Sequence, residues 1–402
     1  MKIIILYTTA ILLSINAKGQ YLNKEDSMLA GLNPVGNNVI ISGYGEAKYS
    51  YDSNFETASF NLTRTVLFVG YRFNSKISLL TEIEIEDAKV DEHGGELAME
   101  QCLIKFDLNK NNYLLAGLFI PRIGIINENH LPTTFNGNDR HVVERMVIPS
   151  TWRELGIAYY GNSNKVAGLN WSLALMNGLN AEGLAGGKGL RSARFSGRDA
   201  TASNLAATAS LLYFNSGLRL QASAYTGGSV GLTPRAADSL GLDSGPFGTP
   251  VNLAEVNAQY SYKGITAKAL VAICNIPDAD KLNTAYAANT PESMYGFFAE
   301  LGYNLLESCS AKKHELILFA RYEMIDLMKT VPENGIKDEL YKQNYLTAGL
   351  TYLPIRNVAI KFDWKHVKTG DPNPALIFAP NPNEPAYEPV NNFYQLGFAY
   401  SF

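Results

Sequence analysis

Ionisable side chains stand among apolar ones in the segment from 121 to 151, PRIGIINENHLPTTFNGNDRHVVERMVIPST. Aliphatic residues such as Ile125 and Val142 would not be needed in a loop that lies in water. We therefore expect this segment to fold into an enclosed space and to narrow it. The alternative is a lid that covers an opening or packs against a neighbouring subunit. The candidate constriction residues are Arg122, Glu128, His130, Asp139, Arg140, His141, Glu144 and Arg145.

Motifs for enzymatic chemistry are nearly absent. GGSVG, residues 227–231, matches the G-x-S-x-G pattern of a nucleophile elbow, but it runs from a strand-like stretch into a Gly-rich loop and does not open a helix. None of the five histidines is an obvious partner for Ser229, and the sequence has no HExxH motif and no CxxC pair. The prediction is no enzymatic activity, no cofactor, and no catalytic or metal-binding residue, with hydrolysis through Ser229 as a third interpretation.

Two further charged runs each have a structural and a functional interpretation. The basic stretch 188–199, KGLRSARFSGRD, forms a solvated face, funnels anions or binds the phosphates of lipopolysaccharide. The acidic stretch EIEIED, together with Asp91, Glu92 and Glu96, offers the oxygen ligands of a hard cation, but no ligand spacing supports such a site.

The amino-terminal segment has the pattern of a secretory signal peptide. Lys2 precedes an apolar run from 3 to 15, and Ala17-Lys18-Gly19 resembles a cleavage site. Cleavage after 19 would remove two of the 34 basic residues and none of the 38 acidic ones, which leaves a net charge of −6. Nucleic acid is therefore not expected as a partner, and three widely spaced cysteines indicate no disulfide framework. We expect a signal peptide at 1–19, a periplasmic segment at 20–37 and a barrel at 38–402.

Apolar and polar residues alternate with period two along the rest of the chain. This predicts about sixteen strands, most of them near the roughly ten residues that a tilted strand needs to cross a bilayer. Short turns follow the even-numbered strands and longer loops follow the odd-numbered ones, as in an outer-membrane barrel, whereas the links of a Greek-key sandwich would break this rhythm. The predicted fold is an all-β, single transmembrane up-and-down antiparallel β-barrel of about sixteen strands, with a long third loop folded into the lumen.

One face of the predicted strands carries most of the charges. In the third strand Glu82, Glu84 and Glu86 alternate with aliphatic residues. A basic residue on the lipid face costs roughly 2 to 4 kcal/mol at the bilayer midplane, so the charged face must line the lumen. The predicted pore-lining residues are Arg64, Arg72, Glu82, Glu84, Glu86, Lys105, Arg219, Lys268, Arg321, Lys361, Asp363 and Lys365.

The sequence ends in NFYQLGFAYSF, with a bulky apolar or aromatic residue at every second position. We expect this aromatic face to meet lipid, and the face with Gln395, Gly397, Ala399 and Ser401 to meet the lumen. The strand would close the barrel by pairing with the first strand. A terminal aromatic strand also resembles the signal that barrel-assembly machinery reads, so that machinery is a predicted partner.

Residues 117–161, GLFIPRIGIINENHLPTTFNGNDRHVVERMVIPSTWRELGIAYYG, resemble the same region of outer-membrane porins in the phosphate-selective porin O and P family. Elsewhere only the strand rhythm and the terminal Phe agree. The resemblance implies a sixteen-stranded porin in the outer membrane of a Gram-negative bacterium, surrounded by lipid and lipopolysaccharide and usually trimeric. It also implies a third loop that enters the pore and basic lumen residues that draw anions.

The signs of the predicted lumen charges decide which solutes are expected. Basic and acidic residues balance on this face, whereas strong anion selectivity needs a net positive path. We therefore predict a passive diffusion channel for small hydrophilic solutes or ions, with weak selectivity set by Arg122, Arg140 and Arg145. Whether phosphate and other anions are among the preferred solutes stays open. The alternative is a closed barrel that serves as a binding or assembly scaffold in the outer membrane.

Overall fold

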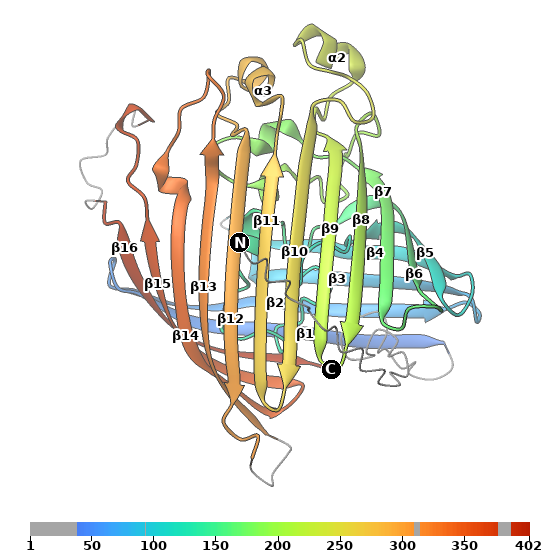
Figure 1. The fold of residues 1–402 in the computed structure, drawn as a ribbon, viewed down its shortest axis with the longest axis vertical. Helices are drawn as coiled ribbons and strands as arrows, with labels where there is room; N and C mark the ends of the chain where they lie inside the picture. The colour runs from blue at the N-terminus through green and yellow to red at the C-terminus, as the bar shows by residue number, and fades with distance from the viewer. Residues whose placement is uncertain (1–37, 93, 309–313, 377–386) are drawn as a thin grey trace, which may run out of the picture.

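The computed structural model describes residues 38–402 except 93, 309–313 and 377–386, so the predicted signal peptide and the segment 20–37 lie outside the described residues. Sixteen antiparallel strands form one closed barrel, in which sequence neighbours pair and β1 also pairs with β16 (Figure 1). The predicted fold class is confirmed. The strands are β1 (Val39–Asp52), β2 (Thr57–Arg72), β3 (Ile77–Asp91), β4 (Gly94–Asp107), β5 (Asn112–Phe119), β6 (Glu154–Asn162), β7 (Leu169–Asn177), β8 (Leu205–Asn215), β9 (Leu218–Gly228), β10 (Pro250–Tyr262), β11 (Ile265–Asn275), β12 (Ser293–Asn304), β13 (Glu315–Thr330), β14 (Lys342–Ile355), β15 (Val358–Thr369) and β16 (Val390–Ser401).

Tight turns join the strands at one end of the barrel. Ser216 and Gly217 link β8 to β9, and Lys263 and Gly264 link β10 to β11; all four residues have positive φ angles. Two such residues in succession match the twist of a hairpin, which fixes the register of both strand pairs.

Longer connections at the opposite end carry the helices. These are α1 (Val143–Met146), α2 (Pro234–Ser239) and α3 (Ala279–Tyr286), with the 3₁₀ turns η1 (Ala181–Leu184), η2 (Leu190–Ala193), η3 (Glu339–Tyr341) and η4 (Pro374–Leu376). None of the helices in the described part of the chain is long and apolar enough to cross a membrane.

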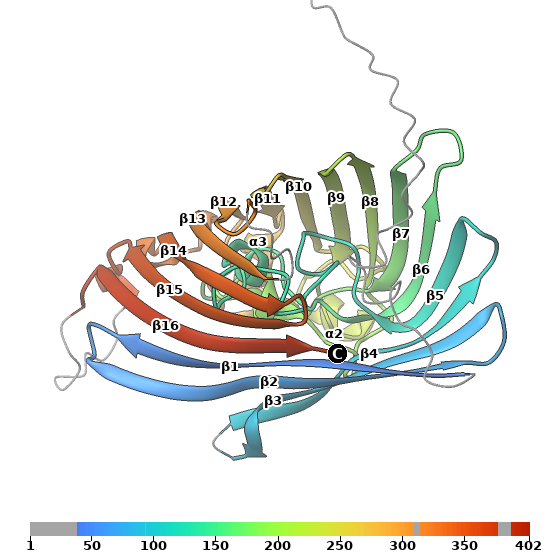
Figure 2. The ribbon, with the colours of Figure 1, turned by 90° about the horizontal axis from the view of Figure 1, so that it is seen from below.

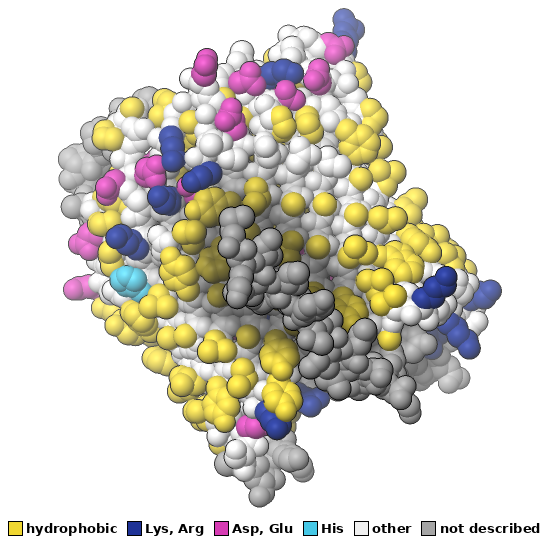
Figure 3. All heavy atoms as spheres, viewed as in Figure 1, with side chains coloured by type: hydrophobic (Ala, Val, Ile, Leu, Met, Phe, Trp, Pro, Cys, Tyr) yellow, Lys and Arg dark blue, Asp and Glu magenta, His cyan; other side chains and the backbone are white. Residues whose placement is uncertain are grey.

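The two faces of the strands differ in composition as their alternation predicts. In β15, Lys361 and Asp363 are buried toward the interior, while Ile360 and Phe362 are each 47% exposed on the outer wall. Figure 3 shows the same division over a wide area, because hydrophobic side chains cover the strand wall and most charged ones gather toward its ends. The barrel therefore has an apolar exterior and a polar interior.

The last strand closes the barrel against the first. Lys48 of β1 lies opposite Gly397 of β16. Beyond the end of β16, the main chains of Gly43 and Phe402 exchange two hydrogen bonds, of 3.2 and 2.9 Å. The Phe402 ring also covers Gly43, since a Cβ at that glycine would lie 2.8 Å from Phe402 Cζ. The final residue is thus part of the closure.

We expect deletion of Phe402 to lower the yield of assembled barrel. The deletion removes both hydrogen bonds to Gly43, which together contribute about 2 kcal/mol at about 1 kcal/mol each. The yield can be measured as the compact, heat-sensitive band on a denaturing gel. Phe402→Tyr keeps the main chain and the ring and should assemble normally, whereas a normal yield from the truncated chain would contradict the prediction.

Candidate functional site

The segment 121–151, hereafter the inner loop, connects β5 to β6 and lies inside the barrel (Figure 2). Its contacts reach strands on widely separated parts of the wall. Asp139 binds Lys48 of β1 at 2.6 Å, and the amide of Gly124 donates to Glu255 of β10 at 3.2 Å. A loop that only covered the mouth could not make these contacts, because the strands face each other across the lumen.

The apolar residues of the inner loop pack onto the inner wall. Ile123, Val143, Val147 and Ile148 are fully buried. Short helix α1 approaches β12 at Gly296, where an added Cβ would lie 2.7 Å from Val143 Cγ1. The absence of a side chain at Gly296 therefore makes room for the helix, and the aliphatic residues of the inner loop form a core against the wall.

A carboxylate and an imidazole organise the middle of the inner loop. Glu144 accepts hydrogen bonds from the amides of Ile125 and Ile126, and its other oxygen lies 2.8 Å from His141 Nδ1. The His141 ring stacks on Phe298 with 3.9 Å between centroids. Burial lowers the pKa of His141, but the hydrogen bond to Glu144 and the Glu300 carboxylate of β12, 3.7 Å from Nε2, outweigh this effect and raise the pKa above its usual value. Both side chains thus serve the shape of the loop.

Charged side chains of the wall bind the main chain of residues 136–139. The Asn138 amide donates to Asp363 at 2.8 Å, and Lys361 donates to the Gly137 carbonyl at 2.8 Å. Arg321 of β13 donates to the carbonyls of Asn136 and Asp139 at 3.4 and 3.2 Å and pairs through its other contacts with wall carboxylates. These predicted pore-lining charges therefore lie beneath the inner loop and hold it.

Asp139 joins the inner loop to the ammonium groups of two lysines on the barrel wall. Its carboxylate lies 2.6 Å from Lys48 and 2.5 Å from Lys365, and accepts from Gln395 at 3.2 Å. Burial raises the pKa of Asp139, but Lys365 and Lys48 outweigh it and hold the pKa well below its usual range. The carboxylate is therefore ionised and bridges β1, β15 and β16.

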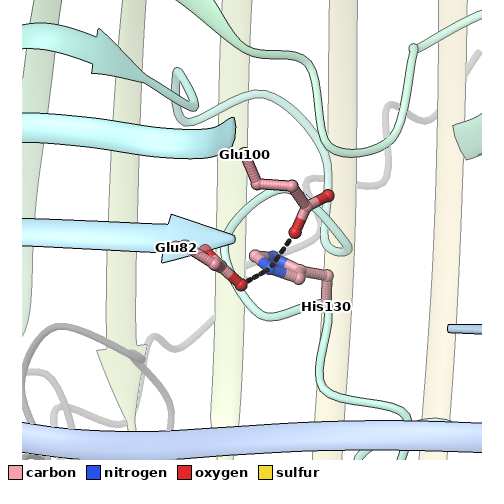
Figure 4. Close-up of side chains that lie close together, drawn as sticks. All are labelled: Glu82, Glu100 and His130. Carbon is pink, nitrogen blue, oxygen red and sulfur yellow. Dashed lines mark hydrogen bonds and ion pairs between the residues drawn. The ribbon is translucent and has the colours of Figure 1, made fainter. Parts of the chain in front are cut away.

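His130 forms a third attachment, to β3 and β4 (Figure 4). Its Nε2 lies 3.2 Å from Glu82 Oε1 and 3.7 Å from Glu100 Oε2. Glu100 is absent from the set predicted by strand parity because β4 contains a bulge. Glu82 pairs with Gln101 and Ile83 pairs with Met99, so Glu100 is an extra residue and turns inward together with Gln101.

Two predicted basic residues form ion pairs with nearby carboxylates. Arg122 is 4% exposed, binds Glu128 at 2.6 Å and stacks on Tyr160. Arg64 binds three wall carboxylates, those of Glu46, Glu84 and Glu86, at 2.9, 2.6 and 3.7 Å. The geometry therefore assigns Arg122 to loop fixation, where the sequence predicted a role in selectivity.

The remaining predicted pore-lining residues are spread over the wall. Arg72 is exposed at the end of β2, and Lys105 pairs with Asp107 at 2.7 Å. Arg219 is buried beside the Phe214 ring, and Lys268 donates to the Thr134 carbonyl at 3.4 Å. Arg219 and Lys268 line one cavity between the inner loop and the wall, whereas Arg72 and Lys105 lie outside it.

Arginines of the inner loop and of the basic stretch 188–199 lie near one another. Arg140 is 9% exposed, and its Nε and Nη2 have no hydrogen-bond partner among the described residues. Arg191 belongs to the basic stretch 188–199. Burial is the main cause that lowers the pKa of Arg191, and the charges of Arg140 and Arg145 lower this pKa further. Arg194 donates to the carbonyls of Ser150 and Thr151 at 3.2 and 2.9 Å. The basic stretch is thus partly buried against the end of the inner loop. We call Arg140, Arg145 and Arg191 the arginine cluster.

We expect Asp139→Asn to loosen the inner loop. The change removes the carboxylate that holds Lys48 and Lys365, and losing a charge-assisted hydrogen bond costs about 1.5 to 3 kcal/mol, reduced here by partial exposure. Hydrogen exchange of the Asn138 and Val142 amides should therefore quicken by about tenfold, since about 1.4 kcal/mol corresponds to that factor. Asp199→Asn, in an exposed loop, is the control, and equal exchange in both variants would contradict the prediction.

Solved structures similar to this one are channels of outer membranes. The anion-selective porin from Comamonas acidovorans aligns with a TM-score of 0.54 and 10% identity, over 90% of this chain and 99% of that chain. The outer membrane channel DcaP of Acinetobacter baumannii has a TM-score of 0.54 and 11% identity, over 90% and 97% of the two chains. OmpF of Salmonella typhi in complex with daunomycin has a TM-score of 0.53 and 12% identity, over 91% and 98%.

Comparisons of sequence identify fewer relatives. No protein-family model matches the chain. An uncharacterized protein of Aquifex aeolicus (strain VF5) is 29% identical over 357 residues, which span 83% of this chain and 78% of that protein. The resemblance to phosphate-selective porins therefore stands on residues 117–161 alone, and the likeness to solved structures concerns the fold. The chain has a porin-like fold, a sixteen-stranded barrel resembling outer-membrane channels.

Proposed function

We propose that the protein is a passive diffusion channel for small hydrophilic solutes in the outer membrane of a Gram-negative bacterium. The observation that carries the proposal is the inner loop, which is fixed to the inside of a sixteen-stranded barrel. A barrel of this strand number encloses an aqueous channel unless something fills it. The apolar outer wall suits lipid, and the porin-like fold agrees with this placement.

A cavity beside the inner loop, with both polar and apolar lining residues, supports a water-filled lumen. A cavity of about 290 Å³ lies between the inner loop and the wall. It is lined by loop residues such as Asn129 and Thr134 and by wall residues such as Lys268 and Glu315. These groups can be hydrated at little cost, whereas a closed scaffold would be expected to fill such a space with apolar side chains.

We expect a weak preference for anions, with phosphate as one candidate. Most wall charges pair with each other or with the inner loop, so they contribute little net potential to the path. The arginine cluster adds positive charge beside the inner loop, and Glu86 offsets part of it. Arg140 and Arg145 therefore keep the role predicted from the sequence, Arg191 joins them, and Arg122 does not. As the family resemblance implies, we also expect a homotrimer.

The channel proposal is tested by conductance in planar bilayers. We expect the purified full chain to produce stepwise increases in current, because the bore would be narrowed but not sealed. A protein that inserts and gives no current would contradict the proposal and would favour the closed scaffold. Heating the sample to unfold the barrel before addition should abolish the steps, which excludes contaminating detergent pores.

Selectivity is tested by the zero-current potential under a salt gradient. Removing one charge about 8 Å from an ion's path changes its energy by about 0.5 kcal/mol in water-like surroundings. The change raises the energy of chloride and lowers that of potassium, so Arg140→Gln and Arg145→Gln should each lower the chloride-to-potassium permeability ratio by about fivefold. Arg198→Gln is a matched control, because its side chain is 91% exposed and lies outside the arginine cluster. A ratio unchanged in both cluster variants would remove these arginines from the selectivity determinants.

A further inference from the structure

Three ligand-type side chains from separate parts of the chain converge where the inner loop meets β3 and β4 (Figure 4). Glu82 and Glu100 are fully buried, and His130 is 2% exposed. One atom of each residue, Glu82 Oε1, Glu100 Oε2 and His130 Nε2, faces the others, and such atoms lie within 4.8 Å of one another. Burying a carboxylate is costly unless a cation or hydrogen bonds compensate its charge, so Glu82 and Glu100 each need such a partner.

Hydrogen bonding within the cluster does not satisfy both carboxylates. His130 Nε2 can donate one proton, and the 3.2 Å contact with Glu82 accounts for it. Glu100 Oε2 is 3.7 Å away, beyond a hydrogen bond, and Glu100 Oε1 is buried with no hydrogen-bond partner among the described residues. The Arg153 guanidinium lies 4.0 Å from Glu100 Oε1, at the limit of an ion pair, and is closer to Glu96, at 3.1 Å. One imidazolium balances only one of the two carboxylates, and the positive charge of Arg153 is shared among Glu100, Glu84 and Glu96.

The separations suit ligands that share a metal ion. Two ligands that are each about 2.1 Å from one ion lie about 3.4 Å apart at a tetrahedral angle and about 3.0 Å apart at a right angle. The two contacts of His130 Nε2, at 3.2 and 3.7 Å, are close to these values. One imidazole nitrogen with two carboxylates is a donor set of the Zn²⁺ class, since Mg²⁺ and Ca²⁺ prefer oxygen alone.

Groups around the cluster hold the carboxylates in place. Gln101 donates to Glu82 Oε2 at 2.7 Å, which leaves Glu82 Oε1 directed at His130. The Tyr44 hydroxyl donates to Glu100 Oε2 at 3.1 Å, and its ring packs edge-on against the His130 ring at 5.8 Å. Such outer contacts fix the orientation of metal ligands. The β4 bulge that turns Glu100 inward supplies the third ligand.

We propose that Glu82, Glu100 and His130 bind one divalent transition-metal ion of the Zn²⁺ class, which clamps the inner loop to β3 and β4. The ion would take the Nε2 position of the imidazole, so any proton on that nitrogen is released to solvent. With a neutral imidazole, the two carboxylates balance the two charges of the ion. The clamp would join Asp139, on the far side of the inner loop, in setting the loop's position.

Zinc binding to the purified full chain in detergent tests this site directly. After treatment with EDTA and its removal, titration calorimetry with zinc chloride at pH 7.5 should show one ion per chain. Titrations in two buffers of different ionisation enthalpy should differ by the heat of the released proton. Glu100→Gln and His130→Gln should each weaken binding at least tenfold. His366→Gln, a histidine on β15 outside the cluster, should bind like the wild type.

A wild-type chain that binds no zinc would overturn the proposal, as would binding that Glu100→Gln and His130→Gln leave unchanged. If the variants do not assemble, as judged by the heat-sensitive band, zinc-edge X-ray absorption on the wild type decides the matter. One imidazole nitrogen together with oxygen neighbours supports the site, and a shell of oxygen alone or with sulfur rejects it. None of these measurements depends on conductance, so the channel proposal and the metal site can fail separately.

Discussion

The structure depends on satisfying the main chain of a long loop that lies inside a barrel. Each buried amide and carbonyl of the inner loop needs a partner, and only some find one within the loop, such as the Asn129 amide, which donates to the Ile125 carbonyl. Side chains bind others: Asp363 accepts from the Asn138 amide, Lys361 donates to the Gly137 carbonyl, and Glu144 accepts from two amides at the start of the loop. These charged side chains of the barrel wall therefore serve mainly to hold the inner loop in place.

This use of the wall charges shapes the proposed channel. A charge that is neutralised by a buried ion pair contributes little field to a passing ion, so the many lysines and glutamates on the inner face do not set selectivity in proportion to their number. Arg321 illustrates the point, because it is fully buried between wall carboxylates and loop carbonyls. In the proposed channel, the groups left to act on solutes are a small set on the loops, chiefly Arg140 and Arg145.

Attachment at several separated points explains how one connection can hold a fixed position. Asp139 binds three strands, residues near α1 pack into the space at Gly296, and His130 lies against β3 and β4. Each attachment involves a different type of interaction, namely ion pairing, apolar packing and a buried carboxylate cluster. Loss of one would loosen the inner loop locally without releasing it from the wall.

The sequence by itself determined the sixteen strands, their inner and outer faces and the tight turns, because period-two alternation and short turn sequences act locally. It also identified the inner loop, because its aliphatic side chains are expected to be buried away from water. Only the tertiary structure decided which charges pair. Arg122 binds Glu128 instead of facing solutes, and Glu100 turns inward through a bulge that breaks strand parity. The first outcome depends on how the inner loop folds back on itself, and the second depends on the register between the neighbouring strands β3 and β4. Neither relation has a signature in the local order of residues.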